Sequence, residues 1–169
     1  LTNPEAFPTP KGHVGVSIPI TYVPLRNTFF LALAGAYLES QLLYNIEMEG
    51  MAPQEVEALI FLAPNAIDYS GYPDCRPEYY QQARQTLMQG SKLWVQYGVD
   101  MRLETPIISM SKSEIVKMGM ELGAPLEHTW SCYEGGEFPC NQCDSCRLRA
   151  KGFAEAGFND PLLVKLGRT

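Results

Sequence analysis

Short apolar runs and helical periodicities alternate along the chain. Residues 58–63 read Ala-Leu-Ile-Phe-Leu-Ala and stop at Pro64, which is the pattern of a central parallel strand covered on both faces. Residues 101–105 form a second, shorter strand candidate that is closed by Pro106. The two runs predict two strands of one parallel sheet.

Helical patterns lie before and between these strands. Residues 29–44 are apolar on most sides, which predicts a helix between two layers, with Asn27 and Thr28 as candidate N-terminal caps. Pro77 suits the first turn of a second helix, whose apolar positions recur at steps of three, four and seven residues until Gly98 ends it.

A third helix follows the second strand. Ser111 and Glu114 have the spacing of a capping box, and the helix is expected to run through Leu122. Strand, loop and helix, repeated in this order, predict an α/β fold with a parallel sheet. Ligands of such sheets bind beyond the carboxyl ends of the strands, where the polar loops 65–76 and 105–112 lie.

Composition narrows the class of partner. The chain is 46% hydrophobic, yet its longest apolar stretches are too short to span a bilayer, so no membrane partner is expected. The net charge of −6 disfavours long contact with a phosphate backbone, so we expect a small-molecule partner and no direct nucleic acid. No signal-peptide pattern opens the sequence, and we expect a cytoplasmic protein.

The cysteines carry the clearest chemistry. Four of the five lie within fifteen residues, a clustering that indicates a reducing compartment and a metal rather than a disulfide framework. Gly135 and Gly136 let the intervening loop fold back, and the two-residue gaps let backbone N–H groups approach the sulfurs. Four thiolates complete a tetrahedral zinc site without room for water, so the zinc is expected to be structural. The predicted ligands are Cys132, Cys140, Cys143 and Cys146.

Two alternatives to zinc stay open at this point. An iron–sulfur cluster is the main one, because C-x2-C-x2-C also begins the ferredoxin motif. That motif has its fourth cysteine four positions later, where this sequence has Ala150. Disulfides or free thiols are the other alternative. Cys75 is separate: in its polar loop it is either a nucleophile or an unreactive small residue.

The polar loop 68–76 combines two carboxylates, two tyrosines and a guanidinium. Carboxylates accept hydrogen bonds from ring N–H and amino groups, and tyrosines stack on flat rings, so the loop suits a planar, nitrogen-rich base. The same composition also fits an ordered surface loop.

Four segments of the chain, in order, resemble the 7-cyano-7-deazaguanine synthase family, which forms preQ0 in queuosine biosynthesis. They are the loop 68–76 (DYSGYPDCR), residues 22–27 (YVPLRN), residues 104–106 with 112–116 (ETP and KSEIV), and residues 129–133 with 140–149. The resemblance implies an adenine-nucleotide alpha-hydrolase-like fold of the N-type ATP pyrophosphatase kind. It also implies an ATP-dependent, nitrile-forming C–N ligase.

Enzymes of this family convert 7-carboxy-7-deazaguanine, ammonia and ATP with Mg²⁺ into preQ0. The carboxylate is adenylated and ammonia gives an amide, which is activated again and dehydrated. The resemblance places Arg26 near the nucleotide and Lys112 at the phosphates, as catalytic residues. If the resemblance is set aside, Arg26 is interpreted as a residue of a structural salt bridge, and Lys112 as a solvated residue in the first turn of a helix. The implied substrate-binding residues are Asp68, Tyr69, Ser70, Tyr72, Asp74 and Arg76.

The chain departs from the family at its front. It begins with Leu1, and no SGGxDS phosphate loop occurs in it, so we expect the C-terminal part of a longer protein. The expected organisation is a linker or loop at 1–18, the C-terminal part of a nucleotide- and substrate-binding α/β domain at 19–125, and a zinc module with a tail at 126–169.

Other functions stay open. One is a non-catalytic, zinc-stabilised module that binds a deazapurine or a partner protein. Another is a different ATP pyrophosphatase-like enzyme. A homodimer is among the expected arrangements, because apolar surface would be exposed where further strands and helices are absent.

Overall fold

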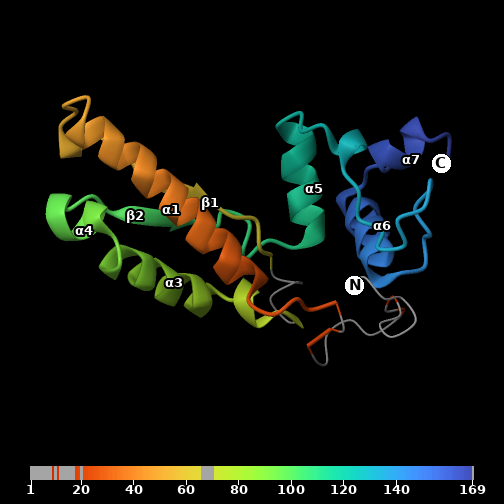
Figure 1. The fold of residues 1–169 in the computed structure, drawn as a ribbon. Helices are drawn as coiled ribbons and strands as arrows, with labels where there is room; N and C mark the ends of the chain where they lie inside the picture. The colour runs from red at the N-terminus through yellow and green to blue at the C-terminus, as the bar shows by residue number, and fades with distance from the viewer. Residues whose placement is uncertain (1–8, 10, 12–17, 20, 66–70, 169) are drawn as a thin grey trace. The chain divides into compact units, whose positions relative to one another are not determined.

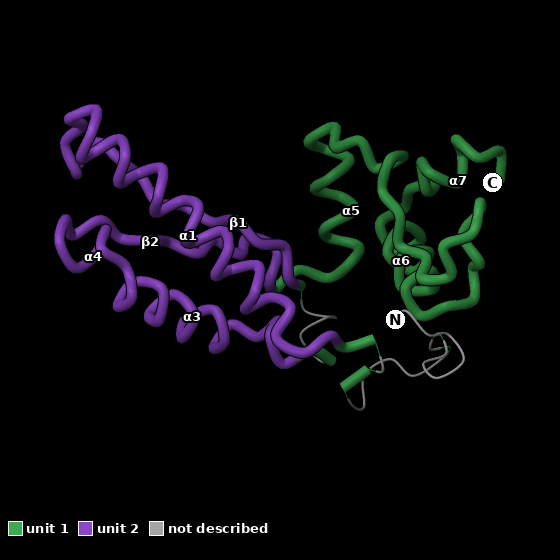
Figure 2. Tube along the Cα trace, in the orientation of Figure 1, with its two compact units in different colours: residues 1–22, 65–72, 109–169 green, residues 23–64, 73–108 purple. Residues whose placement is uncertain are grey.

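The computed structural model describes residues 9, 11, 18–19, 21–65 and 71–168 (Figure 1). Most of the predicted linker 1–18 and part of the polar loop therefore lie outside the described residues. The chain divides into two compact units, which Figure 2 shows in different colours. We call Val23–Pro64 with Pro73–Ile108 the sheet unit, and Leu1–Tyr22 with Asn65–Tyr72 and Ser109–Thr169 the cysteine unit.

The sheet unit contains the predicted parallel pair. Strand β1 (Ala58–Phe61) pairs with β2 (Met101–Glu104), so that Ala58 lies opposite Met101 and Phe61 opposite Glu104. This confirms the parallel arrangement expected from the two apolar runs. Both strands are shorter than predicted, because the pairing stops before Pro64 and Pro106.

Helix α1 (Arg26–Glu47) begins three residues earlier than predicted. Leu25 is the residue before it and has a left-handed backbone with a φ of 55°, and no side chain caps the helix. The prediction that Asn27 or Thr28 would be the cap is therefore wrong. Asn27 instead turns its side chain towards another segment of the sheet unit, as described below.

The prediction of one helix from Pro77 to Gly98 is also wrong, because the structure has two. Helix α3 (Pro77–Gln89) ends at Gly90, and α4 (Lys92–Tyr97) begins after Ser91. Glu39 of α1 explains the break: its Oε1 accepts hydrogen bonds from the hydroxyl of Ser91 at 2.9 Å and from the backbone N–H of Lys92 at 2.6 Å. A carboxylate from another helix thus caps α4, and periodicity alone does not reveal such a contact.

The core of the sheet unit lies between the strands and their helices. Helix α1 contacts β1, α3 contacts β2, and the two helices contact each other. The buried apolar side chains include Leu31, Ala58, Ile60, Tyr80, Met88, Leu93, Val99 and Met101.

The composition of helix α1 predicted that it would be enclosed between two layers, and this prediction is wrong. Leu31 and Gly35 are buried, but a stripe at helical spacing is exposed and consists of Phe30, Leu33, Tyr37, Tyr44 and Met48. After α1 the chain passes through the short 3₁₀ helix η1 (Pro53–Glu55) before it enters β1.

The regular secondary structure that is described in the cysteine unit is helical, with an irregular segment at 129–143. It contains α5 (Lys112–Glu121), η3 (Leu126–His128), α6 (Asp144–Ala156) and α7 (Pro161–Lys165), and α5 packs on α6. The predicted capping box is confirmed: Ser111 Oγ accepts from the N–H of Glu114 at 3.3 Å, and Glu114 Oε2 accepts from the N–H of Ser111 at 2.7 Å. The predicted boundary between domains at residue 126 stays a prediction, but the unit that carries the cysteines includes α5 as well.

None of the helices formed by the described residues is long and apolar enough to cross a membrane. This agrees with the short apolar runs of the sequence.

Candidate functional site

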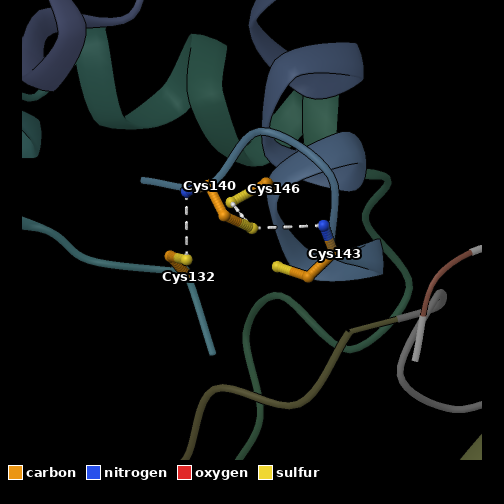
Figure 3. Close-up of side chains that lie close together, drawn as sticks. All are labelled: Cys132, Cys140, Cys143 and Cys146. Carbon is orange, nitrogen blue, oxygen red and sulfur yellow. Dashed lines mark hydrogen bonds between the residues drawn. The ribbon is translucent and has the colours of Figure 1, made fainter. Parts of the chain in front are cut away.

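The four clustered cysteines meet as the sequence predicted (Figure 3). Their sulfur atoms all lie within 4.8 Å of one another. Cys132, Cys143 and Cys146 are buried, and Cys140 is half-buried. Cys75 belongs to the other unit and takes no part in the cluster.

Three of these cysteines are placed by the start of α6. Cys143 is the residue before the helix and Cys146 lies in its first turn. Asn141 has a φ of 57°, the left-handed conformation that lets the chain turn between Cys140 and Cys143. Backbone N–H groups of Gln142 and Cys143 donate to Cys140 Sγ at 3.5 and 3.3 Å.

Cys132 reaches the cluster from a separate segment. Its Sγ accepts hydrogen bonds from the backbone N–H of Cys140 at 3.3 Å and of Glu134 at 3.4 Å. Trp130 donates from its indole Nε1 to the carbonyl of Cys132 at 3.1 Å. The expected approach of N–H groups to the sulfurs is therefore present at Cys132 and Cys140, and a backbone hydrogen bond from Asn141 also reaches Cys146.

These contacts act on the ionisation of the thiols. The N–H groups of Gln142 and Cys143 lower the pKa of Cys140 to about 6, because they stabilise its thiolate. Burial raises the pKa of Cys146, and its contact with the Cys143 thiol acts in the same direction. A bound cation would favour the thiolate form of all four, since metal binding deprotonates its cysteine ligands.

The cluster fits a tetrahedral metal ion. Four sulfurs at about 2.3 Å from a zinc ion are about 3.8 Å from one another, and Cys140 Sγ lies 4.0 Å from Cys146 Sγ. All five cysteines of the chain are described and none forms a disulfide, which argues against the disulfide alternative. The donor set is four sulfurs, all of them supplied by the protein.

The predicted substrate residues fall in three places. Asp68, Tyr69 and Ser70 lie outside the described residues. Tyr72 belongs to the cysteine unit, where its hydroxyl is 2.6 Å from Thr21 Oγ1. Asp74 and Arg76 belong to the sheet unit.

Asp74 has the most unusual environment of these residues. It lies in the 3₁₀ helix η2 (Pro73–Cys75) and is 5% exposed. Its Oδ2 accepts from the backbone N–H of Asn27 at 3.3 Å, and the Asn27 amide donates to the Asp74 carbonyl at 3.0 Å. Its Oδ1 is buried and has no hydrogen-bond partner among the described residues. Buried carboxylate oxygens are normally paired, so this oxygen calls for a donor.

Asn27 was not predicted as part of this site. Its amide also approaches Cys75 Sγ, at 3.7 Å, and so it holds both Asp74 and the neighbouring cysteine. Cys75 is 5% exposed, a setting typical of a small residue in a packed environment. The sequence offers two signals at Asn27, its position before a predicted helix and its place in the segment 22–27, and neither predicts a contact with Asp74.

The two predicted catalytic cations lie at helix starts in different units. Arg26 is the first residue of α1. Burial and the nearby Cys75 raise the pKa of Tyr80, and the positive charge of Arg26 acts in the opposite direction. Lys112 is the first residue of α5. A Cβ atom at Gly152 of α6 would come within 2.8 Å of Lys112 Cβ, so α5 and α6 approach closely at this point.

Comparison with known proteins identifies the family. The family model described as "Queuosine biosynthesis protein QueC" matches residues 2–157. The chain is 48% identical over 145 residues to a 7-cyano-7-deazaguanine synthase of Thermoplasma acidophilum. These residues cover 86% of this chain and 54% of that protein. It is 46% identical over 149 residues to the synthase of Oceanobacillus iheyensis, which covers 88% of this chain and 59% of that protein.

The synthase of a Nostoc species is 44% identical over 146 residues, which cover 86% of this chain and 57% of the relative. The chain thus spans a little more than half the length of the curated relatives it matches. The family match extends from before the first helix to the end of α6 and includes the polar loop and all four clustered cysteines. The chain belongs to the QueC family of queuosine biosynthesis proteins.

Proposed function

We propose that the chain acts in the ATP-dependent conversion of 7-carboxy-7-deazaguanine and ammonia to 7-cyano-7-deazaguanine. The names of its relatives support this reaction, as does the polar loop that resembles the family's signature. The fold expected for such a ligase is adenine-nucleotide alpha-hydrolase-like, and the parallel pair with its covering helices agrees with that fold.

The observation that carries the proposal is the buried Oδ1 of Asp74, which has no hydrogen-bond partner in the described part of the chain. A buried carboxylate oxygen without a donor loses hydration without compensation, at a cost of about 1–3 kcal/mol or more. The pyrimidine-like ring of a deazaguanine presents ring N–H and exocyclic amino donors, which match this oxygen. We therefore assign Asp74 to recognition of the base, and Asn27 to holding its other oxygen in place.

The remaining roles follow from the resemblance. Asp68, Tyr69, Ser70, Tyr72 and Arg76 would bind the base or its carboxylate. Arg26 would lie near the nucleotide, and Lys112 would face its phosphates, where positive charge stabilises departing pyrophosphate. These roles stay proposals.

We also propose that the four cysteines bind one structural zinc ion. Each sulfur would be a ligand, and the ion would hold the segment of Cys132 against the start of α6. With four protein ligands no position is open to water, so the ion would stabilise the fold and not take part in ligation.

Calorimetric titration with 7-carboxy-7-deazaguanine tests the base-binding role. We expect Asp74→Asn to weaken binding about 10- to 100-fold, since a hydrogen bond to a charged group contributes about 1.5–3 kcal/mol. Glu78→Gln is the matched control, because Glu78 is an exposed carboxylate four residues away. Equal affinities of the Asp74→Asn variant and the unmodified chain would contradict the assignment.

A non-catalytic binding module is the second candidate. Such a module would bind the base without an SGGxDS loop, a motif that the 169 residues do not contain. Mass spectrometry of a mixture with ATP, Mg²⁺ and ammonium distinguishes the two. Formation of the nitrile supports the ligase, and binding of the base without any adenylate, amide or nitrile supports the module.

A further inference from the structure

Arg149 lies in the middle of α6, three residues after Cys146. Its side chain is 13% exposed, which is unusual for arginine, a residue that is seldom buried unless it is paired. It belongs to neither the metal ligands nor the predicted substrate pocket, so its burial needs a separate explanation.

The guanidinium of Arg149 holds the segment that leads into Cys132. Its Nη1 donates to Thr129 Oγ1 at 2.8 Å and to Ser131 Oγ at 3.5 Å, and its Nη2 donates to the Leu126 carbonyl at 3.3 Å. These acceptors lie one, three and six residues before Cys132. One side chain of α6 therefore fixes the path of the chain from η3 to this cysteine.

Asp160 holds the guanidinium in place from the other side. Both of its oxygens accept from Arg149, through Nε and through Nη2, the latter at 2.8 Å. The Asp160 side chain is 6% exposed, and its Oδ1 also accepts from the N–H of Leu162 at the start of α7. The ring of Phe153, one turn further along α6, lies 5.2 Å from the guanidinium carbon.

Cys132 depends on such a contact more than the other three cysteines do. Cys140, Cys143 and Cys146 share one turn and the start of one helix, so local backbone geometry brings them together. Cys132 is eight residues from its nearest partner in sequence, across a loop that contains Gly135 and Gly136. An unfixed loop of this kind must lose conformational entropy each time the metal binds.

We propose that Arg149 is a positioning residue for the metal centre, which places the Cys132 thiolate against the other three. The inference rests on the proposed metal site and adds to it the residue that pre-organises its most distant ligand. Because its planar fork bonds several acceptors at once, lysine cannot replace it. Groups that orient metal ligands in this way typically change metal affinity about 10- to 100-fold when they are removed.

The experiment measures zinc transfer from the 169-residue protein to a chromophoric chelator. We expect Arg149→Ala and Arg149→Lys to weaken zinc binding about 10- to 100-fold. Thr129→Val removes only one of the acceptors of Arg149, so it should weaken zinc binding less than the two Arg149 variants do. Lys151→Ala is the matched control, because Lys151 is an exposed cation on the same helix whose ion pair with Glu155 is also exposed.

Cobalt substitution adds a readout that a general loss of stability does not move. The visible absorption of Co²⁺ reports how many thiolates surround it in tetrahedral geometry. Folded Arg149→Lys protein should show the weaker band of a site that has partly lost one sulfur, as Cys132→Ser does. A full four-thiolate spectrum in Arg149→Lys, together with unchanged zinc affinity, would overturn the inference.

A double-mutant cycle then tests whether Arg149 acts through Cys132. If it does, Arg149→Lys should change zinc affinity little once Cys132 is replaced by serine. Losses that multiply fully in the double variant would show a general stabilising role and overturn the inference. An unmodified protein that binds no zinc would refute the proposed metal site and this inference with it, whereas normal zinc binding with a neutral Arg149→Lys would refute the inference alone.

Discussion

The sheet unit and the cysteine unit are stabilised by different physical means. In the sheet unit, the core cluster of buried side chains is apolar, and Leu93 and Met101 are among the most completely buried residues that the structure describes. In the cysteine unit, the most completely buried of the described residues is Cys143. It belongs to a cluster whose other buried members are Cys132 and Cys146. One unit therefore depends mainly on removing hydrocarbon from water, whereas the other, if the proposed zinc site is right, depends in addition on bringing four thiolates to a common ion.

The difference has consequences for how each unit can fail. Burial of apolar surface contributes about 25 cal/mol per Å² and is spread over many residues, so one change weakens it only in part. Metal binding is concentrated in four atoms, and its free energy is folding free energy where no other core exists. The two units should consequently respond to opposite kinds of perturbation.

Removal of the metal should produce the largest effect, and only in the cysteine unit. Structural zinc contributes about 10 kcal/mol or more in small domains, so a strong chelator should unfold the segments from about residue 126 to the end of the chain. Hydrogen exchange followed by mass spectrometry should show loss of protection in α6 and α7 and retained protection in β1 and β2. Uniform loss of protection in both units would contradict the comparison.

Two serine substitutions are the controls for this prediction. Cys132→Ser should lower the unfolding temperature, whereas Cys75→Ser should change it little, because Cys75 lies outside the cluster. Metal analysis that finds less than half an equivalent of zinc, or an iron–sulfur absorption band, would contradict the proposed zinc site.

Truncation of the apolar core should give the second-largest effect, and only in the sheet unit. Leu93 is fully buried at the start of α4, so Leu93→Ala should lower the free energy of unfolding by about 2–5 kcal/mol. Val95→Ala, two residues on and 73% exposed, is the control and should be near neutral. Zinc affinity should be the same in both variants, and denaturant titration with chelator competition measures the two quantities separately.

Helix packing inside the cysteine unit should contribute less. An alanine at Gly152 would place its Cβ 2.8 Å from Lys112 Cβ, so α5 and α6 would have to move apart, at a cost of about 1–3 kcal/mol. Gly119 offers the contrast, because the nearest atom to an added Cβ is a flexible leucine carbon at 3.4 Å. Gly119→Ala should therefore be neutral or slightly stabilising, and thermal unfolding of the zinc-loaded protein compares the two.

Local signals predicted what local geometry controls. The capping box at Ser111 and the parallel strands followed from short patterns, and the thiol cluster followed from spacing. What failed depended on contacts between distant segments. Glu39 of α1 caps the start of α4, and Asn27 holds Asp74 instead of capping its own helix. A side chain that acts 50 residues away leaves no periodic trace in the sequence.

Some features of the candidate site could likewise be predicted from local sequence, and others depend on contacts between distant segments. Its cysteine cluster could be predicted from the sequence because the four cysteines are closely spaced. The burial of Asp74, and the unpaired oxygen that makes it chemically informative, follow from packing around η2 and could not be predicted. Arg149 belongs to one of the segments that resemble the family, but its role appears only when its acceptors near Cys132 are seen together.

ATP binding should be the smallest effect, and it concerns cations that the two units supply separately. Nucleotide affinity in such folds comes mainly from clustered backbone N–H groups at a helix start, which the SGGxDS loop provides and which these 169 residues do not contain. Arg26 is exposed, and solvent-exposed ion pairs contribute only about 0–1 kcal/mol each. Calorimetry with ATP and Mg²⁺ should therefore give a dissociation constant in the millimolar range or no heat at all, a standard free energy of about −4 kcal/mol at best.

Arg102→Ala is a matched control for Arg26→Ala, because Arg102 is a partly exposed cation of the sheet unit that pairs with Glu57. Micromolar binding that Arg26→Ala abolishes and Arg102→Ala preserves would mean that α1 carries a nucleotide site of its own, and that the sheet unit needs no phosphate loop to hold ATP.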